Sequence, residues 1–197
     1  KDMQIDMLSI SGHKIHSPKG IGVLYIRKNL KFKPFIIGGH QENGLRAGTE
    51  NVASIIGLGK ACELALKNID YENTKVRELR DKLECGLVEK IKLTKVNGKN
   101  AERLPNTLNI SFKNVEGEAI LLYLNEKRIC ASSGSACTTG SLEPSHVLMA
   151  MKTPFEYAHG SIRFSFSKYN TIEDVDCVLA EMPAIIEKLR NLSPFQD

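Results

Sequence analysis

Two apolar runs near the start of the chain read Met3-Gln4-Ile5-Asp6-Met7-Leu8-Ser9-Ile10-Ser11 and Gly22-Val23-Leu24-Tyr25-Ile26-Arg27. Both runs are short and rich in aliphatic residues, which is typical of β-strands. The turn-forming residues Pro18-Lys19-Gly20 stand between them. The pattern predicts two strands joined by a polar loop, with Lys14 placed where the first strand stops.

Strand and helix patterns alternate along the rest of the chain. Helical spacing of apolar residues predicts helices at about 51–67, 70–90, 116–125 and 145–151, and a final helix from a capping box at Thr171 and Asp174 to about 190. Alternation and β-rich composition predict strands at 107–112, 129–131 and 160–167. Interleaved elements of this kind indicate an α/β or α+β fold.

The composition is that of a globular protein with a core. The chain has 197 residues, of which 42% are hydrophobic and 25% charged. Its net charge of +4 is spread along the chain, so we expect no nucleic acid partner. No apolar run approaches the roughly 18 residues that cross a bilayer, and no signal peptide is visible. The chain begins with Lys1-Asp2 and runs directly into a strand, so we expect it to be cut from a larger fold.

One cysteine stands in unusual surroundings. Cys137 lies within Ala131-Ser132-Ser133-Gly134-Ser135-Ala136-Cys137-Thr138-Thr139-Gly140-Ser141, a segment of very small, mostly polar residues. Such a segment is a poor place to bury a structural thiol, but it suits an exposed nucleophile that must meet more than one partner.

The other four cysteines form no C-x-x-C pair and have no histidines at zinc-ligand spacing. We expect Cys62, Cys130 and Cys177 to be small buried side chains, whereas the place of Cys85 stays open. An odd number of unpaired thiols favours a reducing compartment, the cytoplasm.

Two segments carry polar side chains that suit anion binding, each with an ordinary structural alternative. Ser11, His13 and Lys14 offer a hydroxyl, an imidazole and an amine, the set that a Schiff-base lysine beside a phosphate requires. The alternative is a surface lysine beside a turn. Residues 34–50 form a glycine-rich loop whose Thr49 and Arg46 either contact a phosphate or belong to a structural connection.

Arg163 lies in an alternating strand segment. Ile162, Phe164 and Phe166 share one face, and Arg163 shares the other with Ser161 and Ser165. The guanidinium is suited to clamp a carboxylate. The alternative is a solvent-facing arginine on an edge strand.

Four segments resemble the signature motifs of the NifS/IscS cysteine desulfurases, in the order of that family. They are Ser11-Gly12-His13-Lys14 with the residues to Gly22, Gly44-Leu45-Arg46-Ala47-Gly48-Thr49-Glu50-Asn51-Val52-Ala53, Ser132-Ser133-Gly134-Ser135-Ala136-Cys137 with the residues to Leu148, and Gly160-Ser161-Ile162-Arg163-Phe164-Ser165. The third segment is similar to the catalytic loop of the long-loop subgroup.

The resemblance implies a fold-type I enzyme that uses pyridoxal 5'-phosphate, forms a homodimer and converts L-cysteine to L-alanine. By position, Lys14 holds the cofactor, Ser11 and His13 bind its phosphate, and Thr49 reaches the phosphate across the dimer interface. Arg163 holds the substrate carboxylate. Cys137 becomes a persulfide and passes sulfur to an iron–sulfur scaffold protein of the NifU/IscU type. No resident metal is implied, although Cys137 is a potential transient iron–sulfur ligand.

The family places other cofactor-binding residues upstream of the lysine motif, so the resemblance implies that this chain is the C-terminal half of the enzyme and inactive without the other half. Residues 1–68 would complete the large cofactor-binding domain, and residues 69–197 would form a small α+β domain. Two alternatives stay open: a selenocysteine lyase or other fold-type I enzyme, and an incomplete fragment that only binds partners.

Overall fold

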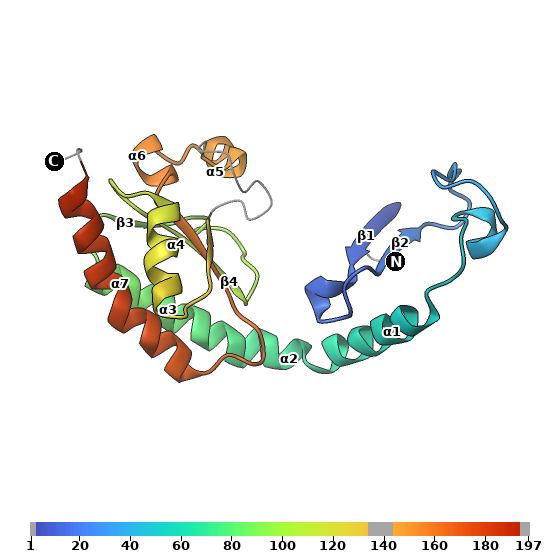
Figure 1. Cartoon of the computed structure of the whole chain (residues 1–197), viewed down its shortest axis with the longest axis horizontal. Helices are drawn as coiled ribbons and strands as arrows, with labels where there is room; N and C mark the ends of the chain where they lie inside the picture. The colour runs from blue at the N-terminus through green and yellow to red at the C-terminus, as the bar shows by residue number, and fades with distance from the viewer. Residues whose placement is uncertain (1–2, 134–143, 194–197) are drawn as a thin grey trace. The chain divides into compact units, whose positions relative to one another are not determined.

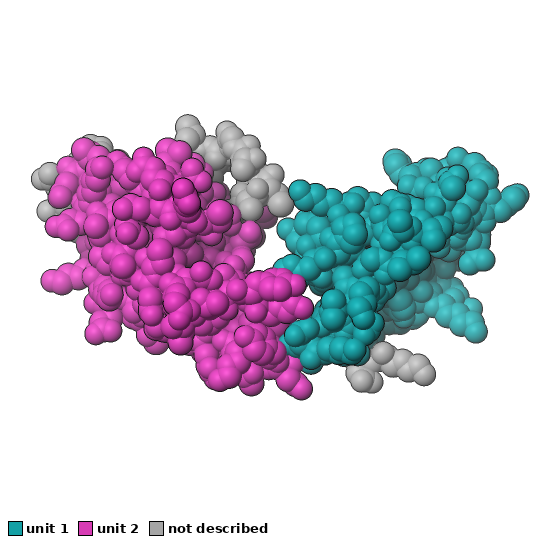
Figure 2. Space-filling view, turned by 60° about the horizontal axis from the view of Figure 1, so that its bottom comes forward, with its two compact units in different colours: residues 1–69 teal, residues 70–197 magenta. Residues whose placement is uncertain are grey.

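The computed structural model describes residues 3–133 and 144–193 of the chain. It divides into two compact units, residues 1–69 and residues 70–197, which are coloured separately in Figure 2. The predicted boundary between residues 68 and 69 concerns the domains of the whole enzyme and stays a prediction.

Unit 1 contains a two-stranded antiparallel sheet and one long helix. Strand β1 (Met7–Ser11) pairs with β2 (Gly22–Ile26), with Met7 opposite Ile26 and Ser11 opposite Gly22. A 3₁₀ turn, η1 (Gly12–Ile15), follows β1, and a second, η2 (Gln41–Gly44), lies in the predicted loop. Helix α1 (Val52–Lys67) begins after Asn51, whose side chain accepts a hydrogen bond from the Ser54 N–H. The two predicted strands and this helix are confirmed.

Unit 2 is built on a four-stranded antiparallel sheet in the order β3-β4-β6-β5 (Figure 1). The strands are β3 (Thr94–Val96), β4 (Thr107–Phe112), β5 (Ser132–Ser133) and β6 (Ser161–Ser165). The short helix α2 (Ile69–Tyr71) begins at the last residue of unit 1. The other helical elements are the π-helical segment η3 (Glu72–Val76), α3 (Arg77–Lys90), α4 (Gly117–Glu126), α5 (His146–Ala150), α6 (Phe155–Ala158) and α7 (Ile172–Leu192). Strand β6 lies between two neighbours.

The core of unit 2 forms where α3, α4 and α7 cover one face of the sheet. Leu108, Ile110 and Phe112 of β4 pack there with Ile162 and Phe164 of β6. The same alternation turns the odd-numbered residues of both strands to the opposite face. The predicted separation of Arg163 from the apolar face is therefore confirmed.

Several local predictions are wrong. The strand expected at 129–131 is instead β5 at Ser132–Ser133, and neither β3 nor α6 was expected from the sequence. Cys62, Cys130 and Cys177, expected to be buried, are exposed, as is Cys85. In α7, the buried side chains next to Cys177 are Val175, Val178 and Leu179. Size and polarity alone misplaced Cys62 and Cys177, because the direction of a helical side chain depends on which helix face meets the core, whereas Cys130 lies between α4 and β5.

No helix within residues 3–133 and 144–193 combines the length and the apolar character that a membrane crossing needs.

Candidate active site

Lys14 lies in the η1 turn, directly after β1. The backbone reverses here because His16, in the left-handed region at φ 64°, closes the turn, and its N–H is donated to the carbonyls of Gly12 and His13. Ser11 Oγ lies 2.9 Å from His13 Nδ1. Ser11, His13 and Lys14 are all exposed. The turn therefore places the Ser11 hydroxyl against the His13 imidazole at one end of β1, and Lys14 follows in the same turn.

Close backbone packing fixes the shape of this turn. Gly12 is buried, and a Cβ there would lie 2.9 Å from both the carbonyl oxygen and Cγ2 of Ile21. The Gly12 N–H donates to the same carbonyl at 2.9 Å, and the Ser17 N–H donates to the Gly12 carbonyl at 3.1 Å. Only glycine allows this approach. The position of Lys14 is thus set by main-chain contacts.

Thr49 lies in the same unit, two residues before Asn51 at the start of α1, and is exposed. The preceding loop is tied down by its own polar groups, since Gly48 N–H donates to Gln41 Oε1 at 3.1 Å. Arg46, the second candidate anion ligand of this loop, donates from Nη1 to the Ala47 carbonyl at 2.8 Å. Arg46 therefore supports the loop itself.

Arg163 lies in unit 2 on the central strand β6, so the edge-strand alternative is wrong. Its neighbours in the ladder are Asn109 of β4 and Ser132 of β5. The side chain is half-buried, and among the described residues no group accepts a hydrogen bond from its buried Nε. A buried guanidinium N–H without an acceptor is costly, so an acceptor from outside this set is expected.

Two more buried polar atoms lie at alternate positions before Arg163. The Nε2 atom of His159 and the hydroxyl of Ser161 have no hydrogen-bond partner within the described ranges. His159 Nδ1 lies 3.7 Å from Glu116 Oε2, and the His159 ring packs edge-on against Phe155. Because only burial shows these atoms to be unsatisfied, the sequence pattern gave no signal for them.

The predicted nucleophile Cys137 lies outside the described residues, which stop at Ser133 and resume at residue 144. Ser132, five positions earlier, is the register partner of Arg163. The sheet thus joins the segment that leads to Cys137 with the strand that carries Arg163. Lys14 and Arg163 belong to different units.

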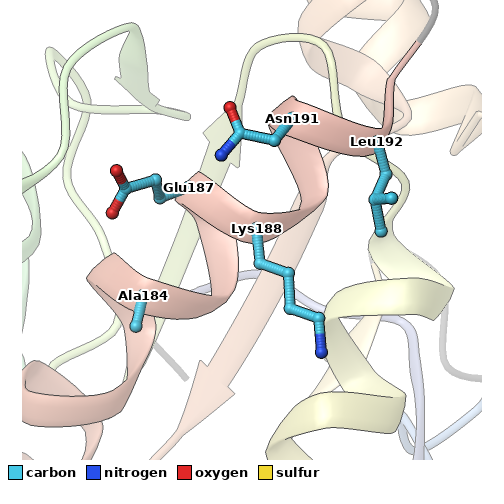
Figure 3. A pocket seen from close by; sticks show the side chains of 5 residues that line it. All are labelled: Ala184, Glu187, Lys188, Asn191 and Leu192. Carbon is cyan, nitrogen blue, oxygen red and sulfur yellow. The ribbon is translucent and has the colours of Figure 1, made fainter.

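An open pocket in unit 2 is lined by residues of α7 alone, Ala184, Glu187, Lys188, Asn191 and Leu192 (Figure 3). Lys188 Nζ lies 4.5 Å from the centroid of the Tyr123 ring on α4, a cation–π contact. None of the predicted site residues lines this pocket. One face of one helix offers no convergent set of polar groups, so the site candidates remain the Lys14 turn and the Arg163 strand.

Comparison with known proteins identifies the family. The model of the class-V aminotransferases matches residues 1–178. The chain belongs to this family. Its α/β fold is pyridoxal-phosphate fold-type I, as expected from the four motifs, and the family depends on that cofactor.

Relatives within the family are NifS-type cysteine desulfurases, which confirms the predicted resemblance. The chain is 63% identical to a cysteine desulfurase of Gluconacetobacter diazotrophicus over 194 residues, and 57% identical to the cysteine desulfurase NifS of Azotobacter vinelandii over 195 residues. These alignments cover 98% and 99% of this chain but 48% of each relative. A NifS-like protein from Rickettsia africae has a similar structure, with a TM-score of 0.84, 37% identity and coverage of 93% of this chain and 48% of the other. The chain therefore spans about half the length of these relatives.

The residues of the Lys14 turn fit pyridoxal phosphate chemically. A hydroxyl and an imidazole offer hydrogen bonds to phosphate oxygens, and an exposed amine is the group that bonds to an aldehyde carbon. The buried Gly12 keeps the turn narrow, so that the Ser11 and His13 side chains lie beside each other. Within the described residues, no ion pair or hydrogen bond engages the Lys14 amine.

Proposed function

We propose that the whole protein is a cysteine desulfurase that converts L-cysteine to L-alanine and captures the sulfur as a persulfide on Cys137. The observation that carries this proposal is the η1 turn, where Ser11 contacts His13 at the end of β1 and the exposed Lys14 is the next residue. In a family that depends on pyridoxal phosphate, this turn supplies a lysine with phosphate-binding groups beside it. The names of the relatives support the choice of substrate.

Each matched residue has one role. Lys14 holds the cofactor and moves the Cα proton of the substrate. Ser11 and His13 donate to the cofactor phosphate, and Thr49 donates to the phosphate bound by the partner protomer. When bound, the cofactor supplies an electron sink for the carbon that loses this proton. Arg163 binds the substrate carboxylate as a planar pair of donors.

Cys137 acts as its thiolate, the nucleophilic form of the side chain. It forms an S–S bond to the substrate sulfur while the bond between that sulfur and the substrate Cβ breaks, and the electron pair of the broken bond stays with Cβ. Protonation of Cβ leads to L-alanine, and Cys137 keeps the sulfur as a persulfide. A thiolate of an iron–sulfur scaffold protein then attacks the terminal sulfur and forms a new S–S bond to it, while the S–S bond to Cys137 breaks and Cys137 leaves as its thiolate.

The described chain would supply part of this enzyme. Because it spans about half of its relatives, we propose that residues 1–68 complete a large cofactor-binding domain and residues 69–197 form the small domain. This proposal is supported by exposed apolar side chains on both faces of the β1–β2 sheet, against which the other half of the enzyme would pack. They include Leu8, Ile10, Val23, Leu24 and Tyr25. The active species is proposed to be a homodimer that contains both halves.

The test is a substitution of Cys137 in the complete protein loaded with cofactor. In the presence of a dithiol that reduces the persulfide to sulfide, we expect Cys137→Ala to abolish L-alanine and sulfide release from L-cysteine, because no thiolate then accepts the sulfur. The visible absorbance of the cofactor should stay as in the wild type, since Lys14 is intact. Cys130→Ala, which removes an exposed thiol seven positions away, is the matched control and should retain activity.

Unchanged sulfide release from Cys137→Ala would refute the desulfurase mechanism. Activity toward L-selenocysteine that survives this substitution, with activity toward L-cysteine lost, would favour the selenocysteine lyase alternative. Failure of the complete protein to bind cofactor would favour a partner-binding module.

A further inference from the structure

Four polar residues lie in one row across the sheet of unit 2. Arg163 on β6 is the register partner of Asn109 on β4 and of Ser132 on β5. Asn97, directly after β3, donates its backbone N–H to the Asn109 carbonyl at 3.0 Å. Residues directly opposite in an antiparallel ladder share a face, with Cβ atoms about 4.5–5.5 Å apart. We call Asn97, Asn109, Arg163 and Ser132 the polar row; it lies on the sheet face away from the apolar core.

The Asn97 side chain fixes the orientation of the Asn109 amide. Asn97 Nδ2 donates to Asn109 Oδ1 at 2.6 Å and to Ser111 Oγ at 2.8 Å, and Asn97 Oδ1 accepts from Thr153 Oγ1 at 3.4 Å. Asn97, Ser111 and Thr153 are buried, so these bonds replace water. With Asn97 in this orientation, a reversed Asn109 amide would set two NH₂ groups against each other. Asn109 therefore turns its oxygen toward Asn97 and keeps its two N–H donors for another partner.

Arg163, the next residue in the row, also offers donors only. A guanidinium has five N–H groups and no acceptor. Its Nε is buried and finds no acceptor among the described residues. Asn109 and Arg163 thus place two sets of donors side by side, with the positive charge on Arg163. The complement of such a pair is an anion with two acceptor oxygens, which a carboxylate provides.

We propose that Asn109 is a second recognition residue for the substrate carboxylate, donating from Nδ2 to one oxygen while Arg163 binds the same group. This inference rests on the proposed function, which assigns Arg163 to that carboxylate. Asn97 acts through Asn109 and is a positioning residue. The polar row then explains why a buried asparagine, rather than an apolar side chain, follows β3.

Binding of propionate to the complete, cofactor-loaded protein tests this inference, because propionate has a carboxylate but no amine or thiol. Its dissociation constant is measured by calorimetry, with neutral propionamide as the comparison ligand. Asn109→Leu removes the donors. Asn109→Asp keeps an oxygen for Asn97 but replaces the NH₂ group with a second oxygen that faces Arg163. Ser165→Ala, on the same sheet face but outside the polar row, is the matched control.

We expect Asn109→Leu to weaken propionate binding by about tenfold or more, the usual effect of losing a hydrogen bond to a charged group. Asn109→Asp should weaken it further, because its carboxylate competes for Arg163. Ser165→Ala should leave the affinity for propionate unchanged. The affinity for propionamide should differ little among all the variants. With L-cysteine, KM should rise in Asn109→Leu while kcat changes little, because the lost contact binds ground state and transition state alike.

The outcomes separate this inference from the proposed function. Affinity for propionate within twofold of wild type in both Asn109 variants, together with a large loss in Arg163→Gln, overturns the role of Asn109 alone. No loss in Arg163→Gln, or no propionate binding by the wild type, refutes the carboxylate role of Arg163 as well. Thermal melting checks that each variant is folded. If Asn109→Leu does not fold, the affinity of Asn109→Asp for propionate decides whether Asn109 binds the carboxylate.

Discussion

Lys14 is the residue on which the proposed chemistry depends most. It is exposed in η1 and held in place by the buried Gly12 and the closing residue His16. Lys14→Ala in the complete protein should reduce L-alanine formation to background, because no other amine in the turn replaces it. Lys19→Ala, five residues later and also exposed, is the control and should remain active.

Peptide mapping adds a direct measurement for the same residue. After borohydride reduction of the loaded protein, the cofactor mass should be found on the peptide that carries Lys14. Cofactor mass attached to Lys19 instead of Lys14 would contradict the assignment of Lys14 as the cofactor-binding lysine.

Gly160 offers a residue-scale prediction about stability. A Cβ at this position would overlap the Phe112 carbonyl oxygen and lie 3.0 Å from Val115 Cγ2. Because a backbone atom cannot move aside cheaply, Gly160→Ala should lower the free energy of unfolding by about 1–3 kcal/mol. Gly59→Ala in α1, where the new Cβ meets nothing within 4 Å beyond its chain neighbours and its own helix backbone, should raise it by about 0.5–1 kcal/mol. Urea unfolding measures both, and equal midpoints for Gly160→Ala and wild type would contradict the prediction.

Among the elements, α7 begins at a capping box that its sequence predicts. The capping box predicted at Thr171 and Asp174 is confirmed: the Thr171 side chain accepts from the backbone of the first turn, and the Thr171 N–H donates to Asp174 Oδ2 at 3.0 Å. Thr171→Ala should destabilise unit 2 by about 1 kcal/mol. Thr171→Ser keeps the hydroxyl and should cost much less. A melting temperature of Thr171→Ala equal to wild type would show that the cap contributes nothing.

The same helix start predicts a pH effect. A hydrogen bond from the Thr171 side chain holds the pKa of Glu173 below its ordinary value of 4.5. A carboxyl whose pKa is lowered by folding stabilises the folded state above its unfolded pKa, and this contribution is lost as the pH falls through the folded pKa. In Thr171→Ala, the pKa of Glu173 should rise toward 4.5. Carboxyl NMR titration measures it, and the Thr171→Ser variant should titrate like wild type.

At the scale of the whole molecule, the two units differ in how much core they have. Every residue of the continuous apolar cluster lies between Leu79 and Ile186, within unit 2. Unit 1 buries mainly Ala47, Leu58 and Ala61 and exposes much of its two-stranded sheet. A two-stranded sheet is marginal without further packing. Residues 70–197 alone should therefore unfold cooperatively and give a dispersed NMR spectrum, whereas residues 1–69 alone should not.

A cooperative transition from residues 1–69 alone would show that the unit needs no further packing. A spectrum without dispersion from residues 70–197 would show instead that the apolar cluster is insufficient by itself.

The sequence by itself determined the family, most of the regular elements and the face on which Arg163 lies. These features are local, because a period of two residues or of 3.6 residues is written along the chain and a motif is a run of neighbours. The tertiary structure alone decided that β6 is central, that Asn97 and Asn109 stand in one row with Arg163, and that Cys62 and Cys177 are exposed. Strand order, register and helix orientation depend on contacts between residues distant in sequence. Asn97 and Arg163 are 66 positions apart, and only the pairing of β3, β4 and β6 brings them into one row.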